Sequence, residues 1–399
     1  MNRKMLRVLI ALLTMTTLTI SGVTLRVQAE ETTSSEKMNN EAISVTSYQK
    51  IISSFSDPDD FRTYPSYYAG AYLNDMGNLV ILVTVETPSV KNAVLESAGN
   101  NNIIFEKANY SYYQLSSLQS QIYIKYQETN KPYLITEIYI DDQNNQLIVA
   151  FDKLSTAAEK WFNDEICSSK AIKLVEYNKP IENKINIISK TNTRIANILT
   201  TSISLKLGQE IRNPSKGSSA RISVGFRAVR NSINGFVTCA HAVSAQGLYN
   251  DVGDTITNSS GTTLGTVQQS LPSKDCCFVG LTNSSDSISN KIYGTSIAIT
   301  SYLAPPQNST VYFRGWTQSV ASGTVTSTSA IETASGFGIS CIKTNIGVNG
   351  GDSGGILYYL YSSGATSGSA CGILTSGTSS YSYFVKASTV VSNLGCTIY

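Results

Sequence analysis

The pattern of apolar and polar residues changes near residue 200. Before that point, apolar strand candidates alternate with helix candidates. After it, the chain is rich in Ser, Thr and Gly, poor in Leu, Lys and Glu, and carries regular turn signals. Many short strands separated by turns are typical of the second pattern. The sequence therefore predicts an α+β half followed by a mainly β half.

The first half contains one arrangement twice: a strand, an Asn/Asp/Gly turn, a second strand, a helix and a third strand. We interpret it as a duplicated β-β-α-β unit, none of whose residues converge as a catalytic set. The matching segments are Tyr72–Asp75 with Tyr139–Asp142, Leu79–Val83 with Leu147–Phe151, Ser89–Ser97 with Ser155–Ile166, and Ile103–Phe105 with Ala171–Val175.

Charge separates the same two parts of the chain. Residues 30–200 hold 15 Lys and Arg against 21 Asp and Glu, a net charge of −6, and are called the acidic half below. Residues 201–399 hold 11 against 7, a net charge of +4, and are called the basic half. The stretch from Ile181 to Ile198 is rich in Asn, Lys and Thr, which favours a connector that is open to cleavage.

The first 29 residues have the pattern of a secretory signal. Arg3, Lys4 and Arg7 precede a mostly apolar run from Val8 to Val23, and Val27-Gln28-Ala29 suits cleavage before Glu30. The apolar run is too short and too rich in threonine for a spanning helix. We therefore expect a secreted, extracellular protein without a stable membrane anchor.

Composition excludes several classes of function. The formal net charge of the chain is +2 and there is no basic run, so nucleic acid is not expected as a partner. Its seven cysteines form no C-x-x-C pair or His/Cys cluster, and we expect no metal and no cofactor. The chain has one histidine, His241, which rules out mechanisms that need two imidazoles.

That histidine follows the apolar strand candidate Gly235 to Ala240. A lone histidine is more often structural than catalytic, so the case depends on the rest of the chain. Glycines flank Asp352-Ser353 on both sides, and such a turn lets backbone N–H groups face a substrate. Between these motifs, Asp275 enters an apolar strand, a place suited to orienting an imidazole.

Chain order distinguishes the hydrolase types. The nucleophile elbow of α/β-hydrolases needs a histidine after the serine, and none follows Ser353. The subtilisin order needs an acid before the histidine and a helix-rich fold, which the β-patterned second half does not offer. The order His241, Asp275, Ser353 is that of chymotrypsin-type enzymes.

From about Leu205 to Tyr399 the chain resembles the bacterial chymotrypsin-like serine proteases of the streptogrisin and alpha-lytic protease group. The segments that carry the resemblance are Val224-Gly225-Phe226, Gly235–His241, Asp275, Gly351–Gly355, Leu374-Thr375-Ser376-Gly377 and the ending Gly395–Tyr399. The resemblance implies a mainly β domain of two antiparallel β-barrels with the triad at their junction. It also implies that residues 30–200 are a propeptide and residues 201–399 the protease domain.

The resemblance also implies residue roles. Ser353 is the expected nucleophile, His241 the general base and acid, and Asp275 the residue that orients the imidazole. The N–H groups of Gly351 and Ser353 are the expected oxyanion donors. Ser376, Gly377 and Thr378 are expected to pair with the substrate main chain, and Arg314 and Asp352 to support the site. For Asp352 we expect Arg314 as a partner, and a solvated arginine is the open alternative.

Substrate preference is predicted in part. Gly347 stands where trypsin-like enzymes carry an acid, and Thr378 stands at a wall position that is usually glycine. We therefore expect a small or medium apolar side chain before the cleaved bond. Cys239, Cys276 and Cys277 stand where the group usually has alanines, and no cysteine pairing is predicted.

The leading prediction is a monomeric serine endopeptidase made as a zymogen, acting on proteins or peptides, with its own propeptide as a folding aid or inhibitor. One alternative is a protease-fold binding protein that has lost activity. Another is a Ser/Thr-rich adhesion or lectin-like sandwich, which would leave His241, Asp275 and Ser353 as a coincidence.

Overall fold

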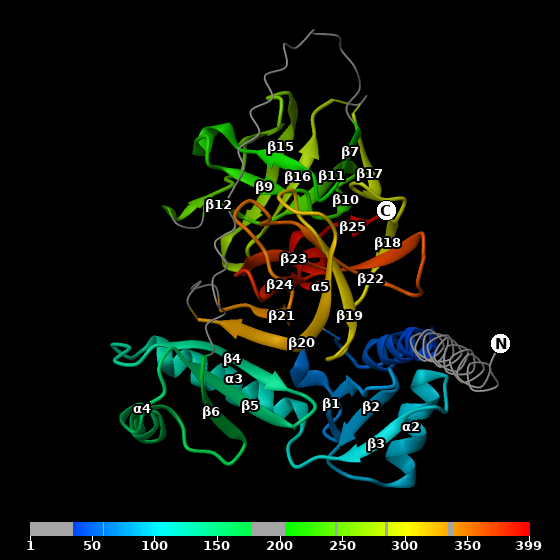
Figure 1. Cartoon of the computed structure of the whole chain (residues 1–399), viewed down its shortest axis with the longest axis vertical. Helices are drawn as coiled ribbons and strands as arrows, with labels where there is room; N and C mark the ends of the chain where they lie inside the picture. Colours follow the sequence, from blue (N-terminus) through cyan, green and yellow to red (C-terminus); the bar gives the residue numbers. More distant parts are fainter. Residues whose placement is uncertain (1–34, 59, 178–203, 244–245, 284–285, 334–337) are drawn as a thin grey trace, which may run out of the picture.

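The structure is a computed structural model that describes residues 35–58, 60–177, 204–243, 246–283, 286–333 and 338–399. The expected signal segment and the connector from Ile181 to Ile198 lie outside these residues. Figure 1 shows the acidic half, in blue to green-blue, below the basic half, in green to red. In the described part of the chain, no helix is both long enough and apolar enough to cross a bilayer.

Both expected units of the acidic half are present, each with an antiparallel strand pair and a parallel third strand. The first comprises β1 (Tyr68–Leu73), β2 (Leu79–Val83), α2 (Pro88–Ala98) and β3 (Ile104–Lys107); the second comprises β4 (Ile135–Asp141), β5 (Gln146–Phe151), α4 (Thr156–Trp161) with the π-helical turn η2 (Phe162–Ile166), and β6 (Ile172–Glu176).

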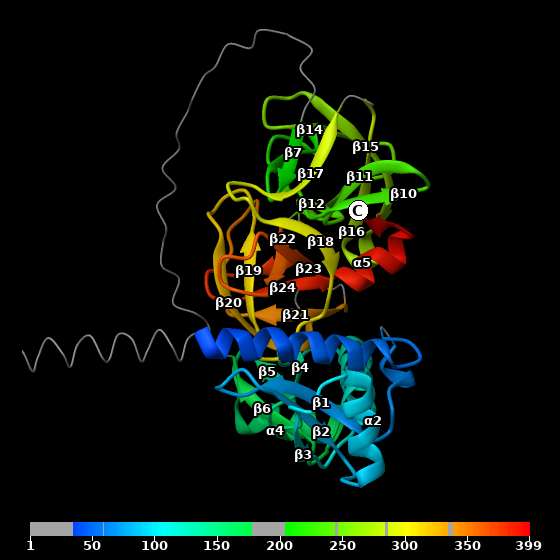
Figure 2. The same ribbon diagram turned by 90° about the vertical axis from the view of Figure 1, so that its right-hand side faces the viewer.

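Two long helices of the acidic half are absent from the sequence predictions. Residues 35–53 are helical, and Figure 2 shows this blue helix running along the boundary between the two halves. The second helix is α3 (Tyr112–Gln127), which begins at a capping box formed by Ser111 and Gln114. A short 3-10 turn, η1 (Phe61–Thr63), lies between them in the sequence. Polar residues interrupt the apolar face of α3, which explains why periodicity alone does not indicate it.

The basic half is built of strands with one terminal helix. One sheet has the order β25-β10-β11-β16-β15-β14-β8-β9, and the strands of the second run from β20 through β19, β22, β23, β18 and β17 to β7, with β21 and β24 attached. The pairings are antiparallel except for β17 with β7 and β18 with β23. The predicted fold class, a mainly β half of two antiparallel barrels after an α+β half, is confirmed.

The bounds of its elements are β7 (Ser204–Leu207), β8 (Glu210–Arg212), η3 (Pro214–Lys216), β9 (Arg221–Ser223), β10 (Arg227–Arg230), β11 (Ile233–Thr238), β12 (His241–Val243), β13 (Leu248–Tyr249), β14 (Thr255–Asn258), β15 (Thr263–Leu271), η5 (Pro272–Lys274), β16 (Cys276–Leu281), β17 (Ser287–Ile292), β18 (Ala298–Tyr302), β19 (Thr310–Arg314), β20 (Ala321–Glu332), β21 (Ser340–Thr344), β22 (Ile356–Leu360), β23 (Ser367–Gly377), β24 (Ser382–Lys386), α5 (Ala387–Leu394) and β25 (Thr397–Ile398).

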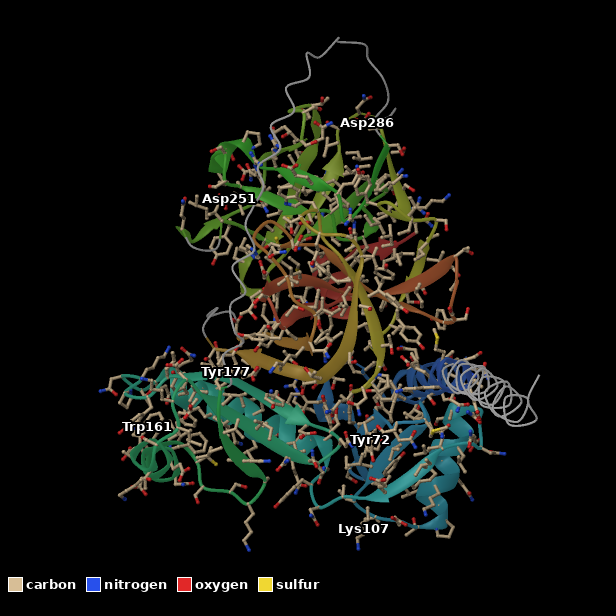
Figure 3. All side chains as sticks on the ribbon, in the orientation of Figure 1. Tyr72, Lys107, Trp161, Tyr177, Asp251 and Asp286 are labelled. Carbon is tan, nitrogen blue, oxygen red and sulfur yellow. The ribbon has the colours of Figure 1, made fainter. Side chains whose placement is uncertain are left out.

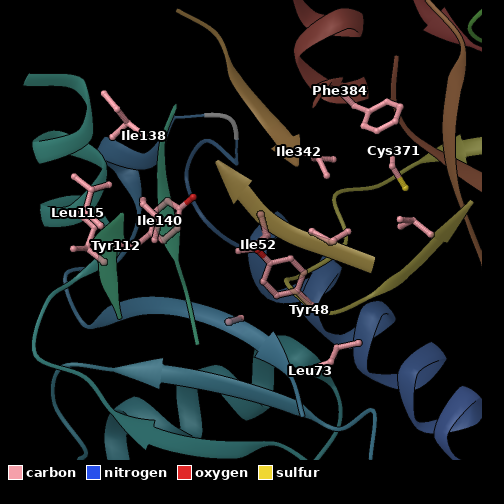
Figure 4. Close-up of a cluster of buried hydrophobic side chains, with 14 of the residues drawn as sticks. Tyr48, Ile52, Leu73, Tyr112, Leu115, Ile138, Ile140, Ile342, Cys371 and Phe384 are labelled. Carbon is pink, nitrogen blue, oxygen red and sulfur yellow. The ribbon is translucent and has the colours of Figure 1, made fainter. Parts of the chain in front are cut away.

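A continuous sheet and a shared apolar core join the two halves. Strand β4 pairs antiparallel with β20, so the second unit of the acidic half extends a sheet of the basic half. One buried cluster includes Tyr48, Leu115 and Ile138 from the acidic half with Ile342 and Phe384 from the basic half (Figure 4). Burying apolar surface across this boundary stabilises the contact between the halves.

Candidate active site

Strand pairing brings His241 and Asp275 together. Strand β11 ends at Thr238, and Cys239 and Ala240 lead from it to His241, which opens the short strand β12. Asp275 ends the 3-10 turn η5 in the left-handed conformation, with φ 45° and ψ 46°, and directly precedes β16. Because β11 and β16 are antiparallel neighbours with Thr238 opposite Cys277, the residues at these two strand ends meet.

The Asp275 carboxylate is fully buried and receives several hydrogen bonds. Nδ1 of His241 lies 2.9 Å from Oδ1 and 2.8 Å from Oδ2 of Asp275, and the His241 backbone N–H donates to Oδ1 at 2.9 Å. Oδ2 also accepts from the Thr375 hydroxyl at 2.5 Å. A carboxylate at Nδ1 places the proton there and leaves Nε2 as the acceptor of the neutral ring.

The pKa of the His241 imidazole lies well above its ordinary value. Burial acts to lower this pKa, whereas the Cys239 sulfur, the Asp275 carboxylate and the hydrogen bonds to both residues raise it. Burial also raises the pKa of the Cys239 thiol, so this sulfur is uncharged at neutral pH. Asp275 therefore supplies the charge that stabilises the imidazolium.

Ser353 lies in a tight turn between β21 and β22. Gly351 and Gly354 have φ values of +99° and +78°, a region that favours glycine. A Cβ on Gly354 would lie 2.1 Å from Oγ1 of Thr238, so the turn packs directly against the strand that leads to His241.

Ser223, at the end of β9, ties this turn to the histidine strand. Its N–H donates to the Ser353 carbonyl at 2.7 Å, and its hydroxyl donates to the Gly351 carbonyl at 3.0 Å. The Ser223 carbonyl in turn accepts from the Thr238 hydroxyl at 2.7 Å. These contacts connect the Ser353 turn, through Ser223, to Thr238 on the strand that leads to His241.

The expected oxyanion donors are the N–H groups of Gly351 and Ser353. Within the described residues, neither donates a hydrogen bond. Ser353 is half-buried, and its hydroxyl makes no hydrogen bond to His241, whose buried Nε2 has no partner among the described residues. Catalytic hydrogen bonds often tighten only when substrate binds.

Asp352 is fully buried beneath the turn. Oδ1 accepts from the Thr317 N–H at 2.9 Å and the Thr317 hydroxyl at 2.6 Å, and Oδ2 accepts from the Asn349 N–H at 3.0 Å. Burial raises the pKa of Asp352, while these bonds and the nearby Arg314 charge lower it. Arg314 makes no hydrogen bond to this carboxylate; its guanidinium stacks over the Tyr293 ring at 5.1 Å.

Residues Ser376 and Gly377 end strand β23. On one side they pair with Tyr383 and Ser382 of β24. On the other side β22 pairs only as far as Ile373, and Leu374 bonds to Gly355. The edge beyond Leu374 therefore has no paired strand in the part of the chain that the structure describes. Thr378 continues from it and accepts from the Val348 N–H at 2.7 Å.

Three residues of the site are missing from the sequence predictions. Thr375 lies within a motif that the resemblance uses, but its bond to Asp275 is not readable from the motif. Ser223 is one of many serines and has no distinguishing context. Asn250 is fully buried, donates its side-chain amide to the Cys239 carbonyl at 3.1 Å and its N–H to the Ala240 carbonyl at 2.7 Å, and so fixes the backbone before His241.

All seven cysteines are free, and all but Cys167 are buried. Among the described residues, no group of three or more His, Cys, Asp and Glu side chains forms a possible metal site. The site itself contains a buried carboxylate in contact with an imidazole, and a turn that carries a serine hydroxyl.

Comparison with known proteins adds to this picture. Residues 31–108 match the family described as "Pro-like N-terminal domain". No curated protein matches the chain. Thermobifida fusca protease A is 22% identical, and the match covers 49% of this chain and 98% of that chain with a TM-score of 0.39.

A Nocardiopsis protease matches at 21% identity over 49% of this chain and 98% of that chain, with a TM-score of 0.39. An alpha-lytic protease homologue, N4, matches at 16% identity over 49% of this chain and 100% of that chain, with a TM-score of 0.37. Residues 31–108, the first part of the acidic half, thus match the Pro-like family, in line with the resemblance to bacterial chymotrypsin-like proteases that carry an N-terminal propeptide.

Proposed function

We propose that this protein is a secreted serine endopeptidase made as a zymogen. In this proposal, residues 1–29 are a signal peptide, 30–200 a propeptide and 201–399 the peptidase domain. The observation that carries it is the buried contact of both Asp275 carboxylate oxygens with Nδ1 of His241. The Ser353 turn is tied by Ser223 to the strand that leads to that histidine.

The proposed reaction passes through an acyl-enzyme. Ser353 Oγ attacks the scissile carbonyl as Nε2 of His241 takes its proton, and Asp275 stabilises the imidazolium. The N–H groups of Gly351 and Ser353 donate to the oxyanion, each contributing about 3 kcal/mol. The C–N bond breaks as His241 returns the proton to the amine, and water releases the acyl group by the same steps in reverse order.

In this proposal the substrate binds as an extended peptide strand that pairs with Ser376, Gly377 and Thr378. Gly347 provides no counter-charge for a basic side chain, and a Cβ added there would lie 2.1 Å from the Ser379 carbonyl oxygen. We therefore propose that the enzyme prefers a small or medium apolar residue before the cleaved bond. Strong cleavage after Arg in a peptide library would contradict it. The peptidase is proposed to be monomeric.

Expression of the exported chain beside a Ser353→Ala variant tests the function. Intact mass is followed over hours. Loss of the acidic half by the wild type alone is the expected result and shows an active site that removes its own propeptide. If neither chain is cut and a fluorophosphonate fails to label the wild type, the proposal is wrong. Cleavage of both would indicate an outside protease, and peptide hydrolysis by the cut wild type then decides.

The second candidate is an inactive protease-fold binding protein. The observation that favours it is the missing hydrogen bond between Ser353 and Nε2 of His241. A fluorophosphonate distinguishes the two candidates directly, because it modifies only an activated Ser353. Labelling of the wild type, and none of a His241→Ala variant, would exclude the inactive protein.

A further inference from the structure

Two glutamates face each other where the halves join. In the antiparallel pair of β4 and β20, Glu137 of the acidic half lies opposite Glu332 of the basic half. Like charges in directly opposite positions destabilise a strand pair. Glu137 is also almost completely buried, with a side chain that is 4% exposed. A buried carboxylate needs specific partners in this position.

The basic half provides those partners. Nζ of Lys343 lies 2.6 Å from Oε1 of Glu137, and the Tyr383 hydroxyl donates to Oε2. The opposing Glu332 has a partner of its own, because Ser376 Oγ donates to its Oε2 at 2.5 Å. Lys343 pairs with Tyr383 across β21 and β24, and Tyr383 pairs with Ser376 across β24 and β23, so the three side chains share one face of the sheet.

Aromatic rings enclose the ammonium group. Nζ of Lys343 lies 4.7 Å from the ring centre of Tyr139, 5.5 Å from that of Tyr381 and 5.9 Å from that of Tyr383. The lysine side chain is 14% exposed. Tyr381 also contacts Tyr177 edge-on at 5.7 Å, and Figure 3 places Tyr177 at the boundary between the halves. Removing either member of a charge pair so enclosed would leave the other buried and unpaired, which is costly.

Both groups that hold the carboxylate in the described part of the chain, the Lys343 ammonium and the Tyr383 hydroxyl, belong to the basic half. We propose that Lys343, Tyr381 and Tyr383 form a recognition pocket for an acidic side chain on an extended strand, and that Glu137 occupies it in the uncut chain. The edge of β20 supplies main-chain pairing and the pocket supplies selectivity, as in peptide recognition by strand addition. After the acidic half departs, an extended segment of another protein with a glutamate in this position is the ligand. This inference rests on the proposed removal of the acidic half, whichever protease makes the cut.

The test uses the full chain with Ser353→Ala and a recognition sequence for an unrelated protease inserted after Tyr177. The chain is cut there, and excess synthetic peptide with the sequence of residues 134–141 is added. Release of the acidic half is measured by size-exclusion chromatography. A twin peptide with glutamine in place of glutamate is the matched competitor. We expect the glutamine peptide to need at least a tenfold higher concentration for half-release.

Single-residue variants test whether Lys343 causes the preference for the glutamate peptide. Lys343→Met should abolish the difference between the two peptides, whereas Lys291→Met, at an exposed lysine of β17, should preserve it. Equal potency of the two peptides on the unmodified pocket, or an unchanged preference in Lys343→Met, would overturn the proposal. Because Lys343→Met could fail to fold, Glu137→Ala provides a second measurement. In the cut Glu137→Ala chain, millimolar propionate should supply the missing carboxylate and slow the release of the acidic half, whereas the uncharged propionamide should not. Equal effects of the two compounds would also overturn the proposal.

Discussion

Thr375 and His241 contact the same oxygen of Asp275. The Thr375 hydroxyl donates to Oδ2 at 2.5 Å, and Nδ1 of His241 lies 2.8 Å from that oxygen. The threonine therefore helps to fix the carboxylate in the plane that the imidazole needs. It also provides a hydrogen-bond partner for a carboxylate that is fully buried.

Replacing this threonine should weaken catalysis without changing the fold. Thr375→Val removes the donor but keeps the shape of the side chain. A hydrogen bond to a charged group contributes about 1.5–3 kcal/mol, so we expect kcat/KM to fall by roughly 10- to 100-fold. Thr375→Ser keeps the hydroxyl and should retain most of the activity. Equal kinetics of the Val and Ser variants would show that the bond has no catalytic role.

The pH dependence of activity should report His241. The imidazole acts as a base only when neutral, and its pKa lies well above the ordinary value of about 6.5. We therefore expect kcat/KM to rise with pH, with a midpoint above 6.5. Asp275→Asn removes the charge that raises this pKa, so its midpoint should be lower and its kcat smaller by a factor on the order of 10³–10⁴. An unchanged midpoint in this variant would assign the titration to another group.

The Ser353 turn, the order of the three candidate catalytic residues and the two units of the acidic half can all be predicted from the sequence. The glycines around Ser353 indicate a turn with positive φ, and the order His241, Asp275, Ser353 excludes the other hydrolase classes. The repeated strand-turn-strand pattern indicates the two units of the acidic half. The turn and the repeated pattern are carried by residues close together in the chain, and the order of the three residues is read directly along it.

The rest depends on contacts between distant segments. No local pattern indicates that β4 pairs with β20, because any strand edge with suitable alternation offers the same main-chain groups. The same holds for Glu137 with Lys343, which are far apart in the sequence and look like ordinary surface charges. Serine and threonine are abundant in the basic half, so neither Ser223 nor Thr375 stands out until the fold places it.

The Ser353 turn should tolerate alanine at one glycine and not at another. Gly354→Ala places a methyl group 2.1 Å from Oγ1 of Thr238 in a backbone conformation that disfavours alanine. We expect activity to fall at least about 100-fold because the oxyanion donors shift. At Gly350, an added Cβ meets nothing within 4 Å, so Gly350→Ala is the matched control and should change stability by less than about 0.5 kcal/mol. Comparable losses of peptide hydrolysis in both variants would contradict this account.

Asp142 should make the stability of the uncut chain depend on pH. It is fully buried at the junction, one carboxylate oxygen accepts from Thr328 of β20 at 3.2 Å, and the other has no partner among the described residues. Burial raises the pKa of Asp142 to about 8, the Thr328 bond lowers it, Asp141 raises it and Lys386 lowers it. The rings of Tyr48, Tyr68 and Tyr112 also lie near this carboxyl group.

The sign of the effect follows from proton binding. The folded chain holds a proton on Asp142 up to about pH 8, whereas the unfolded chain releases it near its ordinary value of 3.8. The free energy of unfolding should therefore fall as pH rises from about 4 to 8 and level off above that range. Asp142→Asn cannot ionise and should flatten this slope, with its largest relative stabilisation at pH 8 to 9.

Urea unfolding of the Ser353→Ala chain at a series of pH values measures this slope. The exposed Asp164, which pairs with Lys160 at 2.6 Å, provides the control variant Asp164→Asn. We expect that control to keep the wild-type slope, because an exposed pair contributes little to stability. If Asp142→Asn and Asp164→Asn give the same pH dependence as the parent chain, Asp142 is ionised in the folded state and the junction tolerates its charge.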